Sequence, residues 1–202
     1  MEGLDWMVTA TGQHAPSPIP KAWHLLEEYY RFYRFLTGIE DVLRQAPDEK
    51  SCLPQLHTLV RKVVLNCYWV HVQKPEPPRD GEISVLNLYD EVGFPFTVQT
   101  VAFSPHSVSP IHNHGTWGAV AVLKGREKNK FWRRVPDAHS DRIECVGELI
   151  LEPGDILSLT PDAIHSVEAI AEEPTITFNI YGETYHKERF EFDAIAGTAK
   201  NY

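Results

Sequence analysis

Apolar residues in the first third of the chain recur at steps of three and four, the spacing that lines one face of a helix. The first such stretch covers residues 23–43, through Leu26, Tyr29, Tyr30, Tyr33, Leu36 and Ile39. The second covers about residues 53–68, and Ser51 is its expected N-cap. Three prolines within residues 11–21 favour an extended arm instead. We therefore predict an arm followed by two amphipathic helices that pack against the remainder.

The pattern changes after a proline-rich junction at residues 74–81, which excludes regular structure. Beyond the junction, short runs rich in Val, Ile, Phe, Thr and Tyr alternate with Gly, Pro and Asp. These runs predict strands at residues 83–89, 96–103, 117–123, 130–134, 148–151, 156–159, 165–169 and 175–181. Many short strands separated by turns are typical of a β-sandwich or a β-barrel. The predicted fold class is mainly β, with the helices as an N-terminal cap.

The length of 202 residues suits one domain, with an arm and helices at residues 1–73 and a barrel with its tail at residues 74–202. Hydrophobic residues make up 43% of the chain and charged residues 23%, as in folded proteins with a buried core. The net charge of -9 argues against a nucleic-acid groove, which needs a positive field. We expect no nucleic-acid partner.

Three cysteines, an odd number with no close pair, argue against a disulfide framework and favour a reducing compartment. The N-terminus lacks a basic start followed by an apolar run, and no stretch of about 18 apolar residues occurs in the chain. We therefore expect a cytoplasmic protein that is neither secreted nor inserted in a membrane.

Two histidines stand two positions apart in the run PIHNHGTWG at residues 110–118. On a strand this spacing places His112 and His114 on the same face. A third histidine, His165, follows a Pro-Gly-Asp turn, a short apolar run and a second turn, and it begins a predicted strand. Imidazoles from two antiparallel strands can converge on one side of a metal ion and leave the opposite positions open. We predict that His112, His114 and His165 bind one divalent metal.

Spacing alone does not identify the metal, because three imidazoles suit iron, zinc, nickel and copper. The other histidines have no comparable context, so we interpret them as surface or packing residues. They are His14, His24, His57, His71, His106, His139 and His186. We therefore expect one metal centre in the chain.

The stretch at residues 110–134, PIHNHGTWG followed by AVAVLKGREKNKFWRR, resembles the first cupin motif of the cysteine dioxygenase family. It is most similar to the bacterial branch of 3-mercaptopropionate-type thiol dioxygenases. Both histidines, the Gly-Thr-Trp-Gly run and the hairpin at Gly125 carry the match, which extends over about residues 23–189. The resemblance implies a cupin double-stranded β-helix, a jelly-roll barrel, with an N-terminal helical extension.

In the wider cupin superfamily a glutamate follows the second histidine as a fourth metal ligand. Gly118 stands at about that position here, so the resemblance implies a three-histidine site. Three neutral imidazoles leave the full double charge on the metal, which favours an anionic ligand such as a thiolate. In thiol dioxygenases the metal is iron(II). The implied function is an Fe(II)-dependent dioxygenase that uses O2 to convert a small thiol with an acidic group to its sulfinate.

The family also places a tyrosine beside the iron, with a histidine two residues before it and a serine two residues before that. The corresponding residues here are Tyr181, Asn179 and Thr177, which alternate along a predicted strand and so face one side. They can form a hydrogen-bonded relay in the catalytic positions that the resemblance implies. An amide does not titrate near neutral pH as an imidazole does, which sets Asn179 apart from the family's histidine.

Two further residues are candidates for substrate binding. In the mercaptopropionate branch an arginine shortly after the tyrosine holds the substrate carboxylate, and Arg189 lies at about that distance. Its planar guanidinium suits a carboxylate, although a solvated place in the charge run 187–189 is the alternative. Trp117 is a candidate for the pocket rim, with a place in the core as its alternative.

Mammalian-type cysteine dioxygenases crosslink the tyrosine to a cysteine near the second histidine, and Gly118 makes such a crosslink impossible. They also bind the substrate carboxylate with an arginine on an early strand. The matching region here, residues 85–87, reads Val-Leu-Asn and contains no arginine. Cysteine is therefore not the expected substrate.

Two other functions stay open. A cupin oxygenase that cleaves a carbon-carbon bond in a diketone-like substrate also works with three histidines, and both Asn179 and the missing early arginine are compatible with it. A non-catalytic cupin that binds a small molecule or stores metal is the third possibility, with Glu168 or Glu183 as a further carboxylate. The sequence does not determine the natural substrate, the metal bound in the cell or the oligomeric state.

Overall fold

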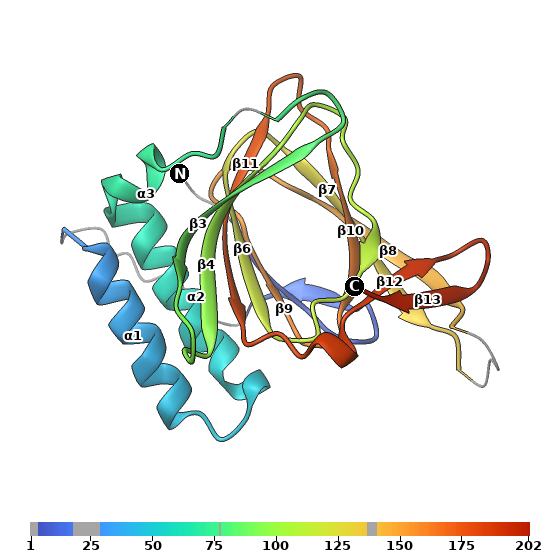
Figure 1. Cartoon of the computed structure of the whole chain (residues 1–202), viewed down its shortest axis with the longest axis horizontal. Coiled ribbons are helices and arrows are strands. Elements are labelled where there is room, and N and C mark those ends of the chain that lie inside the picture. The colour runs from blue at the N-terminus through green and yellow to red at the C-terminus, as the bar shows by residue number, and fades with distance from the viewer. Residues whose placement is uncertain (1–3, 18–28, 77, 137–140) are drawn as a thin grey trace.

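The computed structural model describes residues 4–17, 29–76, 78–136 and 141–202. Figure 1 shows the helices along one flank of a β-barrel and a C-terminal hairpin on the opposite flank. Among the described helices, none combines the length and the apolar character needed to cross a lipid bilayer. The predicted mainly β class with an N-terminal helical extension is confirmed.

The helices are α1 (Phe32–Gln45), α2 (Glu49–Asn66) and α3 (Tyr68–Val72). The sequence predicts that the first helix begins at residue 23, but the backbone is still extended at Arg31 and α1 begins one residue later. Residues 23–28 lie outside the described part of the chain. Tyr29 and Tyr30 keep the helical spacing without being helical, so the apolar periodicity runs past the start of the helix itself.

The second helix begins ahead of its predicted start at Leu53, and its N-cap is Asp48. The backbone N–H of Ser51 donates to Oδ1 of Asp48 at 2.9 Å, and the backbone N–H of Asp48 lies 3.4 Å from Oγ of Ser51. This reciprocal pair is a capping box with serine at its third helical position. The prediction of Ser51 as the N-cap is therefore wrong, because the polar first turn precedes the apolar pattern.

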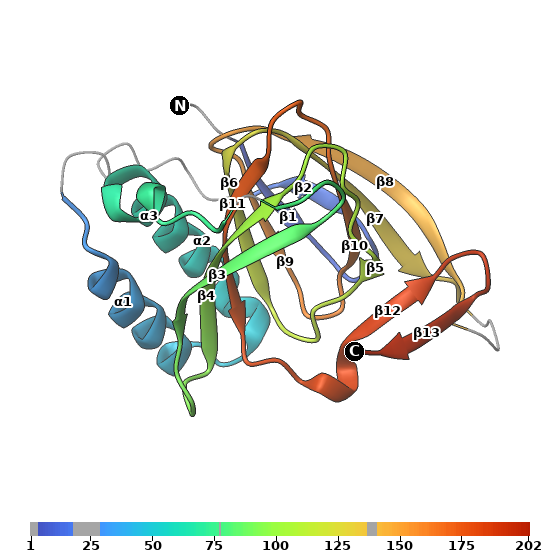
Figure 2. The same ribbon diagram turned by 45° about the horizontal axis from the view of Figure 1, so that its top comes forward.

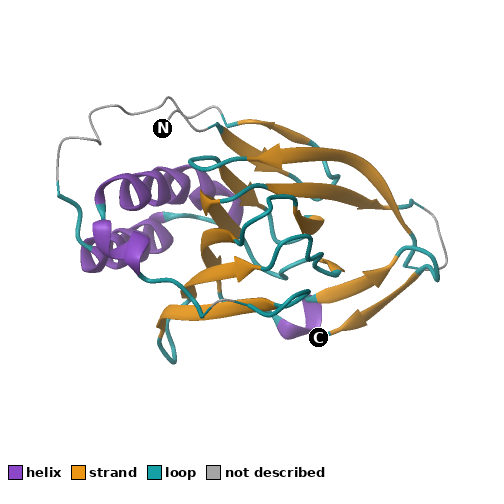
Figure 3. Ribbon diagram, turned by 90° about the horizontal axis from the view of Figure 1, so that it is seen from above, coloured by secondary structure: helices purple, strands orange, loops and turns teal. Residues whose placement is uncertain are grey.

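The predicted packing of the helices against the barrel is confirmed. Seen from above, the helices lie together on one side of the strands (Figure 3). The ring of Phe35 on α1 meets the ring of Phe178 edge-on, with centroids 5.7 Å apart. The shared core of helix and sheet residues includes Ile39, Leu53, Leu56, Val60, Val63, Phe96, Val98, Ala119, Ala121 and Ile180. Burial of this apolar surface holds the helical third of the chain on the sheet.

The described strands form two sheets that curve around a common interior (Figure 2). The seven-stranded sheet has the order β2 (His14–Pro16), β1 (Asp5–Val8), β9 (Ile156–Leu159), β6 (Gly118–Lys124), β11 (Thr175–Gly182), β4 (Phe96–Phe103) and β3 (Ile83–Asp90). The six-stranded sheet has the order β13 (Thr198–Asn201), β12 (Phe190–Asp193), β5 (Ile111–His112), β10 (Ile164–Ala169), β7 (Glu127–Arg134) and β8 (Ile143–Leu151). A 3-10 turn, η2 (His186–Glu188), precedes β12.

Every predicted strand is observed, and those at residues 96–103 and 156–159 have the predicted bounds. The structure adds five short strands that the sequence pattern does not predict: β1, β2, β5, β12 and β13. Two of them are joined to the sheets by strands that lie far away in the sequence, since β1 pairs parallel with β9 and β12 pairs with β5, while β2 and β13 extend these as hairpins. Strands this short do not show a clear alternation of apolar and polar residues. They are therefore recognised from their pairing with other strands and not from the sequence pattern.

A buried polar cluster ties β1 to the second helix and to the barrel. Asp5 forms an ion pair with Arg61, and its Oδ2 lies 3.0 Å from Nε2 of His57. Nδ1 of His57 lies 2.9 Å from Oγ of Ser158 on β9. His57 and Ser158 are buried, and the side chains of Asp5 and Arg61 are 10% and 11% exposed. The cluster is structural, in agreement with the interpretation of His57 as a packing residue.

Alternation along β11 divides its side chains between two environments. Phe178 and Ile180 face the helices and belong to the shared core. Asn179 and Tyr181 point the other way and line a cavity inside the barrel, and Thr177 lies on the same side by alternation. The polar face of this strand is thereby directed toward the histidines.

Candidate metal centre

The three predicted histidines come together at the centre of the six-stranded sheet. His112 ends β5, His114 follows two residues later, and His165 lies opposite His112 on the neighbouring antiparallel strand β10. One ring nitrogen from each residue lies within 4.8 Å of the others. The predicted convergence of the rings is observed, and the group could hold a metal ion. Metal binding itself stays a prediction.

Hydrogen bonds define which ring nitrogens face the cluster. Nδ1 of His112 lies 2.9 Å from the carbonyl oxygen of Pro110, which can only accept, so Nδ1–H donates and Nε2 keeps its lone pair. Nδ1 of His165 lies 3.0 Å from Oδ1 of Asn129. Nε2 of His165 in turn lies 3.0 Å from Nε2 of His114. Two of the three rings are therefore held with an Nε2 lone pair directed inward.

The donor set fits a metal ion. Two nitrogens at about 2.1 Å from one metal and at right angles to each other lie about 3.0 Å apart. The two Nε2 atoms of His114 and His165 have this separation. Imidazole nitrogens are ligands for iron, zinc, copper and nickel alike. The chemistry of the donors therefore supports a divalent transition metal without selecting one.

The electrostatics of the cluster keep the rings neutral. Burial lowers the pKa of His112, and it lowers the pKa values of His114 and His165 well below the ordinary value. The neighbouring histidines lower the pKa values of His114 and His165 further, because two imidazolium charges repel each other. Neutral imidazoles have lone pairs available for a metal at neutral pH.

The tyrosine that the sequence predicts for the site lies against the second histidine. Its ring stacks on His114 with centroids 4.5 Å apart and 25° between the planes. Nδ2 of Asn179 lies 3.3 Å from Oη of Tyr181, so the amide donates to the phenol. Burial raises the pKa of Tyr181, and the buried carboxyl of Glu127 raises it further, so the phenol keeps its proton. Oγ1 of Thr177 has no hydrogen-bond partner among the described residues, so the observed relay joins only Asn179 and Tyr181.

Gly118, which the sequence resemblance places at the position of a fourth ligand, lies against the ring of Tyr181. A Cβ atom added to Gly118 would lie 2.9 Å from Cδ1 of Tyr181 and 3.0 Å from Cε1. Glu168 and Glu183, the two candidates for a further carboxylate ligand, lie elsewhere. Glu168 pairs with Lys128 at 2.6 Å, and Glu183 lines a separate hollow. Within the described part of the chain, the group of possible metal ligands at this position consists of histidines alone.

We expect Gly118→Ala to destabilise the protein by about 1–3 kcal/mol, because the new methyl group overlaps the ring of Tyr181. Urea unfolding monitored by circular dichroism measures the loss. In the double variant Gly118→Ala/Tyr181→Ala the penalty of the methyl group should disappear, so the two changes should not be additive. Additive effects would contradict direct contact between the two positions.

Two residues behind His165 were not predicted from the sequence. Glu127 and Asn129 face inward from β7, and the register places Asn129 opposite Val167 on β10. Oδ1 of Asn129 lies 3.0 Å from Nδ1 of His165, and its Nδ2 lies 2.8 Å from Oε1 of Glu127. The sequence does contain a signal for these two residues. Glu127 and Asn129 stand at every second position before the apolar Phe131, so they lie on the same, buried face of the strand.

Burial raises the pKa of Glu127 to about 7, above its ordinary value of 4.5. The folded protein therefore binds more protons than the unfolded chain between these pH values, and the stability that this carboxyl contributes falls as pH rises from about 4.5 through 7. We expect metal-free wild type to lose about 3 kcal/mol relative to Glu127→Gln between pH 5 and pH 8. Urea unfolding of both proteins in a chelating buffer measures this difference, and parallel stability curves would contradict it.

A cavity of about 470 Å³ opens onto the histidines. Its walls combine apolar side chains of the sheet with polar groups near the site: Ile83, Val85, Val101 and Phe103, with Asn87, Thr97, Gln99, Thr116 and Asn179. Arg189 also lines the cavity and lies over the ring of Tyr202, with Cζ 4.1 Å from the centroid. Nε of Arg189 is buried and has no hydrogen-bond partner among the described residues. The structure thus brings Arg189 to the cavity and not into solvent.

The residue between the two histidines explains how Arg189 reaches the site. Oδ1 of Asn113 accepts from the backbone N–H of Phe190 at 2.7 Å, and its Nδ2 donates to the carbonyl of Glu188 at 2.8 Å. Gly115 follows with φ of 62°, and a Cβ there would lie 3.0 Å from the backbone of Glu188. These contacts hold the backbone of residues 188–190, which contains Arg189, against the loop at residues 113–115.

Trp117 does not line this cavity, which corrects its assignment as a substrate-binding candidate. Trp117 directly precedes β6, and it lies on the side of Ala119 and Ala121, which belong with it to the core shared with the helices. A Cβ added to Gly182 would overlap Nε1 of Trp117. The alternative interpretation of Trp117 as a core residue is the one observed.

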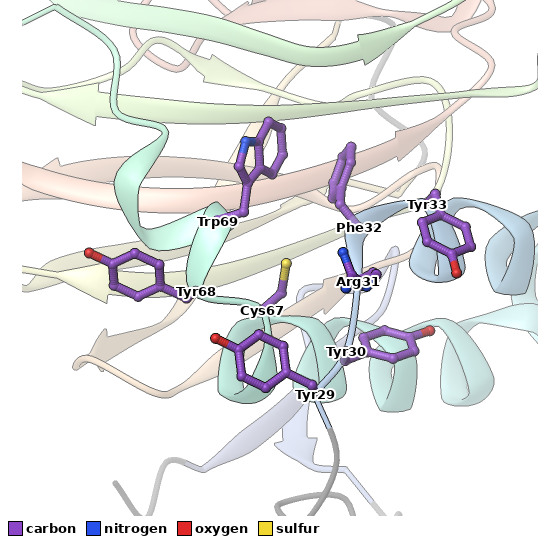
Figure 4. A pocket seen from close by; sticks show the side chains of 8 residues that line it. All are labelled: Tyr29, Tyr30, Arg31, Phe32, Tyr33, Cys67, Tyr68 and Trp69. Atoms are coloured by element: carbon purple, nitrogen blue, oxygen red, sulfur yellow. The ribbon is translucent and has the colours of Figure 1, made fainter.

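A second hollow of about 430 Å³ lies between the start of α1 and α3 (Figure 4). Aromatic side chains dominate its lining, and the rings of Phe32 and Trp69 have centroids 4.7 Å apart. Arg31 and Cys67 also line it, but they belong to no group of possible metal ligands among the described residues. The histidine cavity is therefore the better candidate for a reactive site.

No protein-family model matches the chain. Among solved structures, it is similar to a cupin superfamily protein from Desulfitobacterium hafniense, with 12% identity over 52% of this chain and 81% of the other and a TM-score of 0.41. An oxalate oxidase in complex with the substrate analogue glycolate matches with 12% identity over 55% and 56% of the chains and a TM-score of 0.44. A Cupin 2 conserved barrel domain protein from Salinispora arenicola matches with 17% identity over 50% and 76% and a TM-score of 0.38. All three likenesses are at 17% identity or less, and each concerns the fold alone.

Proposed function

We propose that this protein is a mononuclear non-haem iron thiol dioxygenase that converts a small thiol with an acidic group to its sulfinate. The observation that carries the proposal is the combination of three neutral histidines, without a carboxylate ligand, and one guanidinium at the same cavity. Arg189 is the one Lys or Arg side chain among the described residues that line it. The donor set favours an anionic sulfur ligand, and the guanidinium favours an acidic group at the other end of the same small molecule.

In this proposal His112, His114 and His165 hold the metal. Iron(II), when bound, would supply neighbouring positions for the thiolate and for O2, while the substrate sulfur supplies the four electrons that reduce O2. The overall reaction, R–S⁻ + O2 → R–SO2⁻, is balanced without a further reductant. The thiol loses its proton on binding, because a coordinating thiol is deprotonated.

The other residues of the cavity orient the substrate. The guanidinium of Arg189 can donate two parallel hydrogen bonds to a carboxylate, and its position over Tyr202 limits its movement. The protonated phenol of Tyr181, held by the amide of Asn179, is a hydrogen-bond donor beside the metal position. The buried side chains of Val101 and Phe103 give one wall of the cavity an apolar surface.

The resemblance of residues 110–134 to the cysteine dioxygenase family supports the same function. Gly118 and Arg189 favour the 3-mercaptopropionate-type branch over the mammalian type, since the former needs neither the crosslinking cysteine nor the early-strand arginine. Val85 and Asn87 line the cavity wall where such an arginine would lie. We therefore propose 3-mercaptopropionate or a similar short thiol acid as the first substrate to test.

The test is oxygen uptake by iron-loaded protein with a panel of thiols, combined with mass spectrometry of the products. We expect consumption of 3-mercaptopropionate and a product heavier by two oxygen atoms. Label from ¹⁸O2 should enter both positions of the product. No sulfinate from any thiol of the panel would overturn the proposal.

The apolar wall favours a second candidate, an oxygenase that cleaves a diketone-like substrate at the same metal. Ile83, Val85, Val101 and Phe103 form a surface that needs no acidic group on its ligand. Diketone consumption without any thiol activity would decide for this function. Stable metal binding without oxygen uptake from either substrate class would instead indicate a non-catalytic metal-binding cupin.

A further inference from the structure

Two buried polar residues outside the ligand set form a chain that ends on His165. Oε1 of Glu127 accepts from Nδ2 of Asn129 at 2.8 Å, and Oδ1 of Asn129 faces Nδ1 of His165 at 3.0 Å. Glu127 and Asn129 are 1% and 0% exposed. The mechanism above uses neither of them, and neither forms part of the cavity wall. A buried carboxyl and a buried amide both cost free energy, so their arrangement needs an explanation.

The chain fixes the direction of each hydrogen bond. A side-chain amide has one donating and one accepting end, and a carboxylate only accepts. Oε1 of Glu127, as part of the carboxylate or as the carbonyl oxygen of the protonated acid, therefore takes the donating end of Asn129 and leaves the accepting oxygen for His165. An accepting oxygen requires the proton of His165 on Nδ1, which leaves the lone pair on Nε2, the nitrogen directed toward His114.

The three histidines are not held alike. His112 is fixed by the carbonyl of Pro110, a backbone acceptor that no side-chain change removes. Nε2 of His114 lies 3.0 Å from Nε2 of His165, so without a metal His114 must donate its proton to the lone pair of His165. If His165 carried its proton on Nε2 instead, it would offer no lone pair to a metal. Glu127 and Asn129 on β7 thus govern the tautomer of His165, whose Nδ1 faces a side-chain acceptor and not a backbone carbonyl.

We propose that Glu127 and Asn129 are positioning residues that hold His165 in the tautomer and orientation needed for metal binding. This inference rests on the proposed metal centre. It assigns a role to the inward polar face of β7, and it predicts that metal affinity depends on residues that do not touch the metal. Residues that orient a ligating histidine are commonly worth about 10- to 100-fold in metal affinity.

The test measures cobalt(II) binding to the full chain by isothermal titration calorimetry and by the visible absorption of the bound ion. We expect Asn129→Leu to weaken cobalt binding by about 10- to 100-fold, because it removes the acceptor for Nδ1 of His165. Glu127→Gln/Asn129→Asp exchanges the amide and the carboxylate and retains both hydrogen bonds, so it should restore most of the affinity. Asn66→Leu on α2, which removes an amide that donates to the carbonyl of Lys62, is the matched control and should bind cobalt like wild type.

A second measurement needs no metal. The ¹⁵N chemical shifts of the His165 ring in metal-free protein report which nitrogen carries the proton, and we expect Nδ1–H in wild type and in the exchange variant but a mixture in Asn129→Leu. Unchanged cobalt affinity and an unchanged tautomer in Asn129→Leu would overturn the inference while the metal centre stands. No cobalt binding by wild type would overturn the metal centre, even if the shifts agree with the tautomer argument.

Discussion

Replacing His165 with alanine will abolish stoichiometric metal binding. The residue supplies one of three converging nitrogens, and within the described part of the chain no carboxylate or thiolate lies in the same group to replace it. Loss of a residue that only orients a metal ligand typically lowers metal affinity by about 10- to 100-fold. Loss of a ligand itself should lower the affinity by more than about 100-fold. Metal analysis after dialysis, together with calorimetric titration, measures the effect.

The control for this change is His186→Ala, which removes an exposed histidine outside the cluster. This variant should bind metal like wild type and have the same melting temperature. His165→Ala removes two buried polar contacts, with His114 and Asn129, at a cost of about 1–3 kcal/mol each, and we expect the variant to remain folded. Full metal occupancy in His165→Ala would show that the histidine cluster is not the binding site.

Replacing Arg189 with leucine should lower kcat/KM for a thiol that carries a carboxylate by about 30-fold or more. The reason is that the carboxylate of the bound substrate would lose the guanidinium with which it pairs. The guanidinium lines the cavity with a buried Nε that has no partner among the described residues, so it is available for an anionic substrate. A neutral thiol of similar size should react with little change. Oxygen-uptake kinetics with both thiols on iron-loaded protein measure the contrast.

Arg189→Lys tests the geometry of the interaction, because it keeps the charge but loses the two parallel donors. It should fall between wild type and Arg189→Leu with the acidic thiol. Arg133→Leu is the matched control, since that exposed arginine pairs with Glu144 on the outside of the barrel. An equal loss for acidic and neutral thiols in Arg189→Leu would mean that the residue supports the site without binding the carboxylate.

The sequence predicts the larger elements of the fold well, because each shows its own pattern. The strand at residues 96–103 is rich in Val, Thr and Phe and is observed with its predicted bounds. By contrast, β1 and β12 are short, and their existence depends on β9 and β5, which lie far away in the chain. The start of the second helix is missed for a different reason, since Asp48 and the polar first turn precede the apolar periodicity.

The convergence of the histidines is predictable because the spacing of His112 and His114 and the turn before His165 each restrict the backbone. The sequence does not reveal Glu127 and Asn129, since their role depends on the register between β7 and β10. The correct side for Trp117 can be read from the strand that follows it, because alternation places it with Ala119 and Ala121, which face the helices. This alternation along the predicted strand at residues 117–123 was available from the sequence.

The parallel pairing of β1 with β9 has a practical consequence for anyone who shortens this protein. A truncated form that lacks Asp5–Val8 would leave the backbone groups of β9 bare and would remove the counter-ion of a buried arginine. A bare strand edge is a template for pairing with strands of other molecules. Expression trials should therefore retain the leading segment, since its deletion favours insoluble aggregates even though the histidine cluster lies on the other sheet.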